Sequence, residues 1–430
     1  MTEPLRIAVA GLGTVGAGTL KLLANQSELL AQRCGRPLHI TAVSARDRDR
    51  DRGLDLSGMV WFADAVAMAR EAEADVVVEL IGGEDGIARA VCQAAIESGR
   101  HVVTANKAML AHHGTALARL AEEARVSLHF EAAVAGGIPI VKSLREGLAG
   151  NRVRRVYGIL NGTCNYILTV MRETGRDFAE VLAEAQELGY AEADPGMDVD
   201  GVDSAHKLAL LASLAFGCEV DLPSVYVEGI RHLSPQDIEY AGELGYRIKL
   251  LGSARLTGHG LEQRVHPCMV DEAAPIAHVD GVYNAIVATG DFVEDTGYEG
   301  RGAGAGPTAS AVVADLADIA RGRTTPTFSV PAAQLVQLPP SPMTRHEGPY
   351  YIRLTVIDRP GVIADVSAAF RDEQVSIESM LQRGRSPSEA VPVVLTTHTT
   401  QEGRMQRALA QIAHLDSVVE PPCMIRIEDL

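Results

Sequence analysis

Between Gly189 and Lys207 the sequence gathers five acids ahead of one lysine. Asp203 and Lys207 stand four residues apart in a segment predicted to be helical from about Gly201, so they share one face. An acid beside an amine on one face could bind a charged substrate or move protons. The same residues also fit a solvated loop with an exposed ion pair worth ~0.3–0.5 kcal/mol. Their spacing does not fit an EF-hand calcium loop. The five acids are Glu192, Asp194, Asp198, Asp200 and Asp203.

A glycine-rich motif lies near the start of the chain, where Gly11, Gly13 and Gly16 frame Thr14 and Val15. It follows an apolar run and opens a helix-like segment, which is the context that a dinucleotide-binding G-x-G-x-x-G requires. The first glycine makes a tight turn, the second admits a pyrophosphate, and the third lets helix and strand pack closely. Free N–H groups at the helix start favour an anion. The motif predicts a dinucleotide site, with a glycine turn that binds no ligand as the alternative.

Basic residues follow two of the predicted strands, at the strand ends where open α/β sheets bind ligands. Arg46 stands just after the predicted strand 39–45, where NAD-preferring folds usually carry an acid. It could pair with a 2′-phosphate, which favours NADP, with NAD also usable. The segment from Thr104 to Lys107 lies at the C-terminal end of the predicted strand 101–106, and Lys107 could meet a phosphate, an oxyanion or a carboxylate. A solvated loop around Arg46 and a surface lysine at 107 are the structural alternatives.

Two further glycine segments interrupt the regular pattern. Residues 131–139 break a strand with two glycines and a proline. Carbonyls freed by such a turn could coordinate a hard cation such as Na⁺, although the residues alone favour a turn without metal. Residues 300–306 hold four glycines and lead into a helix. They suit close backbone approach to a cofactor or a substrate anion, or a flexible lid.

The elements that must position these residues indicate an α/β protein. Within residues 1–140, apolar runs alternate with helical segments, which predicts a parallel, Rossmann-type dinucleotide-binding domain. Residues 141–337 mix helices with strand-like segments and predict an α+β domain. The proline-rich stretch 338–349 suits a linker. Residues 350–430 have the order strand, helix, strand, strand, helix, strand, which predicts a small βαββαβ sandwich.

The composition excludes several classes of protein. The 430 residues are 47% hydrophobic and 22% charged, as in an ordinary globular protein with several domains. A net charge of −17 makes nucleic acid and anionic membrane poor partners. No membrane-spanning run and no signal peptide are expected. The six cysteines are scattered without a C-x-x-C, so a reducing, cytoplasmic environment is expected and a disulfide framework or zinc site is not.

Several segments together resemble the homoserine dehydrogenase family. Within residues 5–325 they keep the family's order and spacing. The C-terminal unit resembles an ACT domain, whose first helix is entered through Asp358 to Val362. No kinase-like segment is present, so the chain does not resemble the fused aspartokinase form. The segments are GLGTVG, TANK, FEAAVAGGIPI, NGTCNYIL, YAEADPGMDVDGVDSAHKLA and GAGAGPTASAVVADL.

The resemblance implies reversible NAD(P)-dependent oxidation of L-homoserine to L-aspartate 4-semialdehyde, on the route to threonine, methionine and isoleucine. Carried over by position, Lys207 is the proton donor, and its pKa must fall from ~10.4 for work near neutral pH. Lys107 is a second cation that can touch the substrate oxygen. Glu192 and Asp203 bind homoserine, and Asp198 helps with its ammonium. The resemblance also implies cofactor contacts at Gly189 and Gly304, and a sodium ion on the carbonyls of Glu131, Val134, Gly136 and Ile138.

The resemblance further implies an oligomer and a regulator. ACT domains usually pair edge to edge, and the middle domain of this family dimerises through its sheet, so a homodimer or homotetramer is expected. ACT domains of the family often mediate inhibition by threonine, which makes an amino-acid effector the expected ligand of the last domain.

Two other functions remain open from the sequence. An enzyme like aspartate-semialdehyde dehydrogenase would need a thiolate nucleophile, for which Cys164 is the candidate, although a packing role is favoured. A non-catalytic NADPH-sensing protein with an ACT domain would bind the cofactor without turning over homoserine. The Asp203–Lys207 pair and the acidic block argue against this second alternative.

Overall fold

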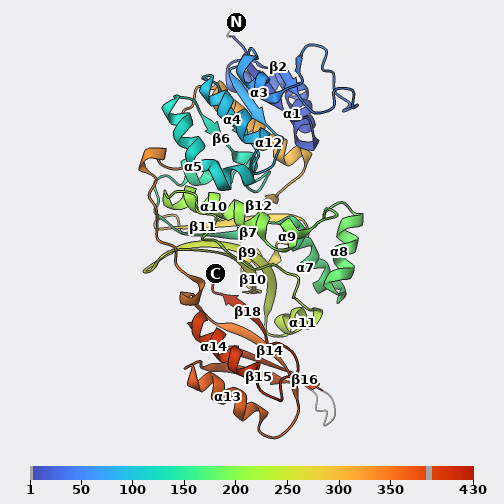
Figure 1. The fold of residues 1–430 in the computed structure, drawn as a ribbon, viewed down its shortest axis with the longest axis vertical. Helices are drawn as coiled ribbons and strands as arrows, with labels where there is room; N and C mark the ends of the chain where they lie inside the picture. The colour runs from blue at the N-terminus through green and yellow to red at the C-terminus, as the bar shows by residue number, and fades with distance from the viewer. Residues whose placement is uncertain (1–2, 384–389) are drawn as a thin grey trace.

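The computed structural model describes residues 3–383 and 390–430, and shows three units stacked along one long axis (Figure 1). Residues 1–2 and 384–389, which belong to the first and last predicted domains, lie outside the described residues. The C-terminus returns to the boundary between the middle and last units (Figure 1). Within the described residues, no helix combines the length and the apolar character needed to span a membrane.

The first unit is built on a six-stranded sheet with the order β3-β2-β1-β4-β5-β6, in which every pairing is parallel. Its central strand β4 is buried throughout and consists of three valines followed by Glu79, and the buried valines are expected for a sheet covered by helices on both faces. The sheet confirms the predicted Rossmann-type fold. Its strands are β1 (Leu5–Ala10), β2 (Leu38–Ser44), β3 (Val60–Phe62), β4 (Val76–Glu79), β5 (His101–Thr104) and β6 (Leu128–His129).

One helix of the first unit comes from far along the chain. Helix α12 (Ala305–Ala320) packs against α1, where a Cβ on Gly18 would lie 2.7 Å from the carbonyl oxygen of Ala305. Its side chains Val312 and Leu316 share a core with β1 and β2. Residues 305–320, grouped by the sequence with the middle domain, therefore pack on the first unit. The other helices here are α1 (Thr14–Asn25), α2 (Ser27–Cys34), α3 (Ala65–Glu71), α4 (Ile87–Glu97) and α5 (Lys107–Glu123).

The middle unit pairs an antiparallel sheet, in the order β12-β11-β7-β9-β10, with a layer of helices. Helix α10 is buried along most of its length because it lies between this sheet and α5 of the first unit. The strands are β7 (Val153–Ile159), β8 (Tyr226–Val227), β9 (Tyr246–Thr257), β10 (Gly260–Asp271), β11 (Tyr283–Gly290) and β12 (Asp295–Arg301). The helices are α6 (Ile140–Lys142), α7 (Gly162–Thr174), α8 (Phe178–Glu187), α9 (Gly196–Val199), α10 (Val202–Phe216) and α11 (Pro235–Glu243).

The C-terminal unit has the predicted βαββαβ order, and its sheet continues the middle sheet. Strand β18 pairs with β14 on one side and, in parallel, with β10 on the other. The proline-rich stretch also lies along β10, since Leu261 exchanges backbone hydrogen bonds with Pro339 and Ser341. The elements are β14 (Tyr350–Ile357), α13 (Val362–Asp372), β15 (Ile377–Gln382), β16 (Ala390–Thr397), α14 (Glu402–Ile412) and β18 (Cys423–Glu428), with a small pair β13 (Glu347–Gly348) and β17 (Thr400–Gln401).

Candidate active site

A cleft of about 960 Å³ opens between the first and middle units. The described residues that line it do not include the glycine motif at 11–16, Arg46, Thr104 or the segment 131–138. The cleft thus joins most of the acid–amine chemistry, while the dinucleotide motif lies outside it. The predicted site residues that line it are Lys107, Gly189, Glu192, Asp198, Asp203, Lys207 and Gly304.

Helix α10 holds Asp203 and Lys207 on one buried face, as their spacing predicts. The helix begins after Gly201, whose φ of +84° suits glycine, and places Asp203 in its first turn. Lys207 Nζ lies 2.7 Å from Asp203 Oδ2 and donates a second hydrogen bond to the carbonyl oxygen of Leu160, also at 2.7 Å. Both charged groups are buried, so this pair differs from the exposed ion pair that the sequence left open.

Lys107 reaches the same carboxylate from the other wall of the cleft. It is the first residue of α5, which is capped by the Asn106 side chain accepting the N–H of Met109 at 3.0 Å. Lys107 Nζ lies 2.9 Å from Asp203 Oδ1, so one carboxylate bridges two ammonium groups. The Lys107 side chain is 39% exposed against 9% for Lys207.

The two lysines differ in acidity because their surroundings differ. Burial lowers the pKa of Lys207; Asp203 opposes this shift, and the charge of Lys107 adds to it. Asp203 raises the pKa of Lys107. Burial alone would raise the pKa of Asp203, but the two lysines hold it well below its usual value. Lys207 is therefore the more acidic ammonium group and Asp203 is ionised.

The other acids of the block have separate environments. Asp198 is half-buried, and burial raises the pKa of its carboxyl group, with a further contribution from Asp203. Glu192 is exposed at the rim of the cleft. Asp200 instead pairs with Arg231 at 3.1 Å, and Asp194 accepts the N–H of Gly196 at 3.2 Å. Asp200 therefore forms a surface ion pair, while Asp194 stabilises the conformation of its own loop at the edge of the cleft.

The glycine motif has the geometry that a pyrophosphate needs. A Cβ on Gly16 would lie 2.0 Å from the carbonyl oxygen of Gly11, so the third glycine is needed for close packing. At Gly13 a Cβ would meet no heavy atom within 4 Å, which leaves this side of the turn open. Helix α1 has no side-chain cap and no acid in its first turn, so its N–H groups can receive an anion. The residues present fit a dinucleotide.

Of the two predicted strand-end residues near the glycine motif, Arg46 is exposed and Thr104 is buried. Arg46 is exposed just beyond β2. In the same loop, Arg52 Nε donates to the carbonyl oxygen of Leu12 at 3.2 Å, so the arginine-rich loop folds back on the motif. Thr104 is buried, and its hydroxyl donates to Glu79 Oε2 at 2.6 Å. Thr104 therefore orders the strand end from behind and does not face the cleft.

The segment 131–139 forms a tight loop against the second glycine cluster. Ala135 and Gly136 have φ of +55° and +49°, and a Cβ on Gly136 would lie 2.4 Å from the carbonyl oxygen of Gly302. The carboxylate of Glu131 accepts two backbone N–H groups, and burial raises its pKa to about 7. The Ile138 carbonyl accepts one N–H at 2.8 Å, which leaves a lone pair for a cation.

Sequence reasoning missed two amide side chains beside Lys207 and the acids of the cleft. Asn161 Nδ2 donates to Asp198 Oδ1 at 2.8 Å and to Asp203 Oδ2 at 2.9 Å. Asn284 Nδ2 donates at 3.0 Å to the Leu160 carbonyl that also binds Lys207. The NGTCNYIL stretch contains Asn161, but a motif along the chain does not show which distant side chains will contact it.

Cys164 does not behave as a nucleophile. Its side chain is fully buried in α7, and burial raises the pKa of its thiol well above the usual value. The thiol donates to the backbone carbonyl of Asp198 at 3.2 Å. Cys164 therefore packs and orients the acidic loop, as the sequence favoured.

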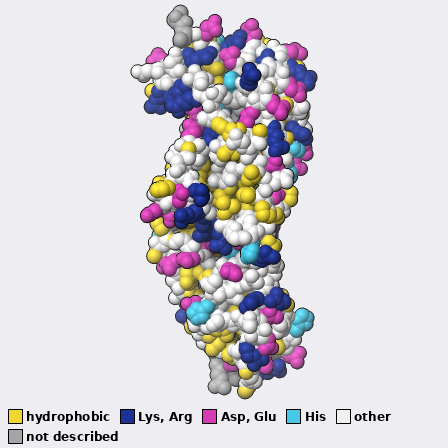
Figure 2. Space-filling model, turned by 90° about the vertical axis from the view of Figure 1, so that its left-hand side faces the viewer, with side chains coloured by type: hydrophobic (Ala, Val, Ile, Leu, Met, Phe, Trp, Pro, Cys, Tyr) yellow, Lys and Arg dark blue, Asp and Glu magenta, His cyan; other side chains and the backbone are white. Residues whose placement is uncertain are grey.

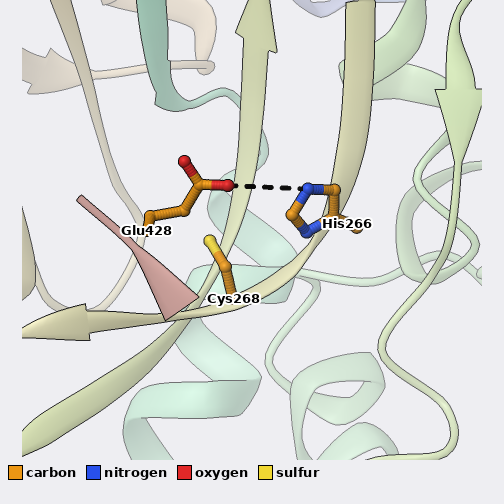
Figure 3. Close-up of side chains that lie close together, drawn as sticks. All are labelled: His266, Cys268 and Glu428. Atoms are coloured by element: carbon orange, nitrogen blue, oxygen red, sulfur yellow. Dashed lines mark ion pairs between the residues drawn. The ribbon is translucent and has the colours of Figure 1, made fainter. Parts of the chain in front are cut away.

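Within the described residues, two buried groups have the composition of metal ligands, but their carboxylates already pair with cationic side chains. Figure 3 shows His266, Cys268 and Glu428 together where β10 meets β18. Arg264 donates to His266 Nε2 at 3.0 Å and to both oxygens of Glu428, and His266 Nδ1 lies 2.9 Å from the Pro267 carbonyl. The lone pairs are thus engaged. In the group His129, Asp315 and Asp318, the Lys142 ammonium forms ion pairs with both carboxylates, whereas the His129 ring nitrogens have no hydrogen-bond partner in the described part of the chain.

A Rossmann-type sheet with an open glycine turn, next to a cleft with a buried lysine–carboxylate pair, defines a nicotinamide-dependent oxidoreductase. Family models agree: the homoserine dehydrogenase NAD-binding domain matches residues 11–131, homoserine dehydrogenase 139–317, and the ACT domain 350–414. The chain belongs to the homoserine dehydrogenase family. It interconverts L-homoserine and L-aspartate 4-semialdehyde with a nicotinamide cofactor, a step of amino-acid biosynthesis. The two alternative functions find no support.

Individual relatives are similar over most or all of the chain. Homoserine dehydrogenases of Neisseria gonorrhoeae and Pseudomonas aeruginosa are each 45% identical, with 100% of this chain covered and 99% and 100% of theirs. The crystal structure of a homoserine dehydrogenase from Thiobacillus denitrificans has a TM-score of 0.93 at 44% identity, covering 99% of this chain and 98% of its own. A hyperthermophilic archaeal homoserine dehydrogenase in complex with NADPH has a TM-score of 0.64 at 25% identity, covering 76% of this chain and 100% of its own.

Proposed function

We propose that Lys207 is the acid–base residue of this homoserine dehydrogenase. The observation that carries the proposal is the buried contact of Lys207 with Asp203 at 2.7 Å, next to the second cation Lys107. In homoserine oxidation the neutral Lys207 amine accepts the hydroxyl proton, and in the reverse direction its ammonium donates a proton to the aldehyde oxygen. Lys107 stabilises the same oxygen while it carries negative charge. A bound nicotinamide cofactor supplies the hydride chemistry.

The acids of the cleft bind the substrate ammonium in this proposal. Homoserine is a zwitterion, so its ammonium group needs anionic partners, and Glu192, Asp198 and Asp203 line one cleft with the proposed acid–base residue. Asp203 has a second role, since it orients Lys207 through their hydrogen bond.

The cofactor is proposed to be NADP, with NAD usable. The pyrophosphate binds the turn of Gly11, Gly13 and Gly16, and Arg46 pairs with the 2′-phosphate. The contact of Arg52 with Leu12 supports this preference, because it folds a basic loop onto the same turn. The NADPH complex of the archaeal neighbour is consistent with it. The remaining cofactor contacts proposed are Thr14, Val15, Thr104 (through the strand end), Lys107, Gly189 and Gly304.

A sodium ion is proposed on the backbone carbonyls of the 131–138 loop. Backbone carbonyls are hard oxygen donors that suit such a cation. The left-handed turn at Ala135 and Gly136 supports the proposal, because it interrupts regular carbonyl pairing. Thermal unfolding in NaCl against matched choline chloride tests it without an activity assay, and equal transition temperatures would contradict it. The four carbonyls are those of Glu131, Val134, Gly136 and Ile138.

The assembly and regulation of the enzyme are proposed in general terms. A homodimer or homotetramer is supported by the hydrophobic side chains that gather over the central part of the molecule in Figure 2. Phe292, 86% exposed between β11 and β12, adds an apolar side chain at the sheet edge. An amino-acid effector such as threonine is proposed for the ACT domain. A reducing, cytoplasmic location fits six cysteines without a disulfide.

The decisive experiment measures homoserine-dependent reduction of NADP⁺ and of NAD⁺ by wild type and Lys207→Ala. We expect turnover in the wild type and its collapse in the variant, with cofactor binding retained. Turnover that survives in Lys207→Ala would remove this lysine from the chemistry and leave Lys107 as the candidate.

A further inference from the structure

We infer that Asn161 is a positioning residue that holds Asp198 and Asp203 in one fixed arrangement for the reaction. This inference rests on the proposed roles of Asp203 and Lys207. Asn161 touches neither of the two lysines through a hydrogen bond that the structure records, so it acts through the carboxylates.

The geometry gives the two ends of the Asn161 amide different tasks. Its Oδ1 accepts the backbone N–H of Cys164 at 2.8 Å and caps α7. Its Nδ2 donates to Asp198 Oδ1 at 2.8 Å and to Asp203 Oδ2 at 2.9 Å. Since a backbone N–H can only donate, the cap fixes which end of the amide faces the acids. The orientation of the amide therefore does not depend on a choice between nitrogen and oxygen.

The bridge addresses a conflict within the site. Two carboxylates brought close together repel each other, and each raises the pKa of the other. A neutral donor between them relieves that repulsion without adding a positive charge that would pair with Asp203 in place of the lysines. Asp203 Oδ2 receives both Asn161 and Lys207, so the amide also limits the directions from which Lys207 can approach it. Asn161 thus couples the substrate-binding acid to the acid–base pair.

The protonation state of Asp198 is the property that Asn161 changes most directly. Burial raises the pKa of Asp198, and the Asn161 hydrogen bond lowers it. The other groups that face Asp198 come from three helices. They are Asp203 and Lys207 from α10, Thr163 and Cys164 from α7, and Lys107 from α5. None of these groups is removed when Asn161 is changed, so loss of the Asn161 hydrogen bond raises the Asp198 pKa further.

The two tasks of the amide can be separated by substitution. In Asn161→Ser the hydroxyl oxygen can still cap α7, but the bridge to both carboxylates is lost. In Asn161→Asp the cap is kept and a third carboxylate replaces the donor. The matched control is Asn165→Ser, because Asn165 is also buried in α7 and donates to the carbonyls of Val279 and Tyr283, away from the acids.

The test measures the pH profiles of kcat and kcat/KM for homoserine oxidation by the full-length enzyme. For Asn161→Ser we expect kcat to fall about 10- to 100-fold, because a positioned charge-assisted contact is lost. The acidic limb of kcat/KM should move to higher pH, and further in Asn161→Asp. Asn165→Ser should keep the wild-type limbs whatever its stability.

Each other outcome overturns the inference. Unchanged profiles in both Asn161 variants would show that the bridge is not used, and a lower kcat with unmoved limbs would reveal only a structural role. An equal shift in Asn165→Ser would trace the effect to α7 as a whole. Lys207→Ala is measured in parallel, so that the two proposals can fail separately. Turnover in Lys207→Ala would refute the proposed acid–base role. An inactive Lys207→Ala together with wild-type profiles in Asn161→Ser would refute the positioning role alone.

Discussion

Arg264 on β10 donates two hydrogen bonds from Nη2 to Glu428 on β18, at 2.7 Å to Oε1 and 2.9 Å to Oε2, although the residues are 164 positions apart in the sequence. Both side chains are almost fully buried. The pair lies where β18 adds in parallel to β10, so the ACT domain is part of the same sheet as the middle unit. This contact is the basis of the first two predictions.

Breaking the Arg264–Glu428 pair should destabilise the protein strongly. Glu428→Gln removes one of the two buried carboxylates that contact the Arg264 cation, the other being Glu262. Breaking such a buried ion pair typically costs ~3–5 kcal/mol. Urea unfolding measures the loss of unfolding free energy. The exposed ion pair Arg371–Asp372 in α13 supplies the control. Asp372→Asn should change stability by less than ~1 kcal/mol. Similar values for the two variants would show that burial of the pair is unimportant.

The same ion pair should make the free energy of unfolding depend on pH in the acidic range. Burial opposes ionisation of Glu428, but Arg264 and His266 hold the pKa of its carboxyl group well below the usual value. A depressed folded-state pKa means that this stabilisation is fully present above the unfolded value of ~4.3 and is lost as the pH falls below it. Unfolding free energies measured from pH 7 downward should therefore decline less steeply in Glu428→Gln than in wild type. Parallel curves would contradict this.

Removing either lysine of the cleft should affect turnover to different degrees. Lys207→Ala should lower kcat by about 10²–10⁴-fold, the usual range for a lost general acid–base group. Lys107→Ala removes a supporting cation and should have a smaller effect on kcat. Steady-state rates with homoserine test this, with cofactor binding by fluorescence titration as the control for folding. A larger loss in Lys107→Ala would exchange the two roles.

The two directions of the reaction should have opposite pH dependence. In the proposed mechanism, semialdehyde reduction needs the Lys207 ammonium, so its rate should fall as pH rises through a pKa that burial has lowered. Homoserine oxidation needs the neutral amine and should rise over the same interval. In Lys107→Ala, loss of the neighbouring positive charge should move both limbs to higher pH. Limbs that stay in place would show that Lys107 does not influence Lys207.

Cofactor choice should depend on the basic loop after β2. Arg46→Ala should raise the KM for NADP⁺ by about 10-fold or more, as expected for one lost charge-assisted contact to phosphate, and leave the KM for NAD⁺ nearly unchanged. Arg371→Ala, an exposed arginine in α13, is the control for net charge. Equal changes for both cofactors would place the 2′-phosphate elsewhere.

The sequence by itself determined the features that depend on neighbours along the chain. The glycine motif, the shared helical face of Asp203 and Lys207, and the βαββαβ order of the last unit were all predicted and are present. Each follows from local periodicity or from a turn that only certain residues allow. The helix-like segment that follows the glycine motif divides at Gln26 into two helices, α1 and α2.

Only the tertiary structure decided which distant segments meet. Helix α12 packs on α1, β18 joins β10, and Lys107 meets Asp203 from another unit. The bridging role of Asn161 also depends on this, because its amide acts only where the loop carrying Asp198 and the helix carrying Asp203 converge. Such contacts depend on how apolar faces pack in three dimensions. The residues adjacent in sequence do not determine that packing.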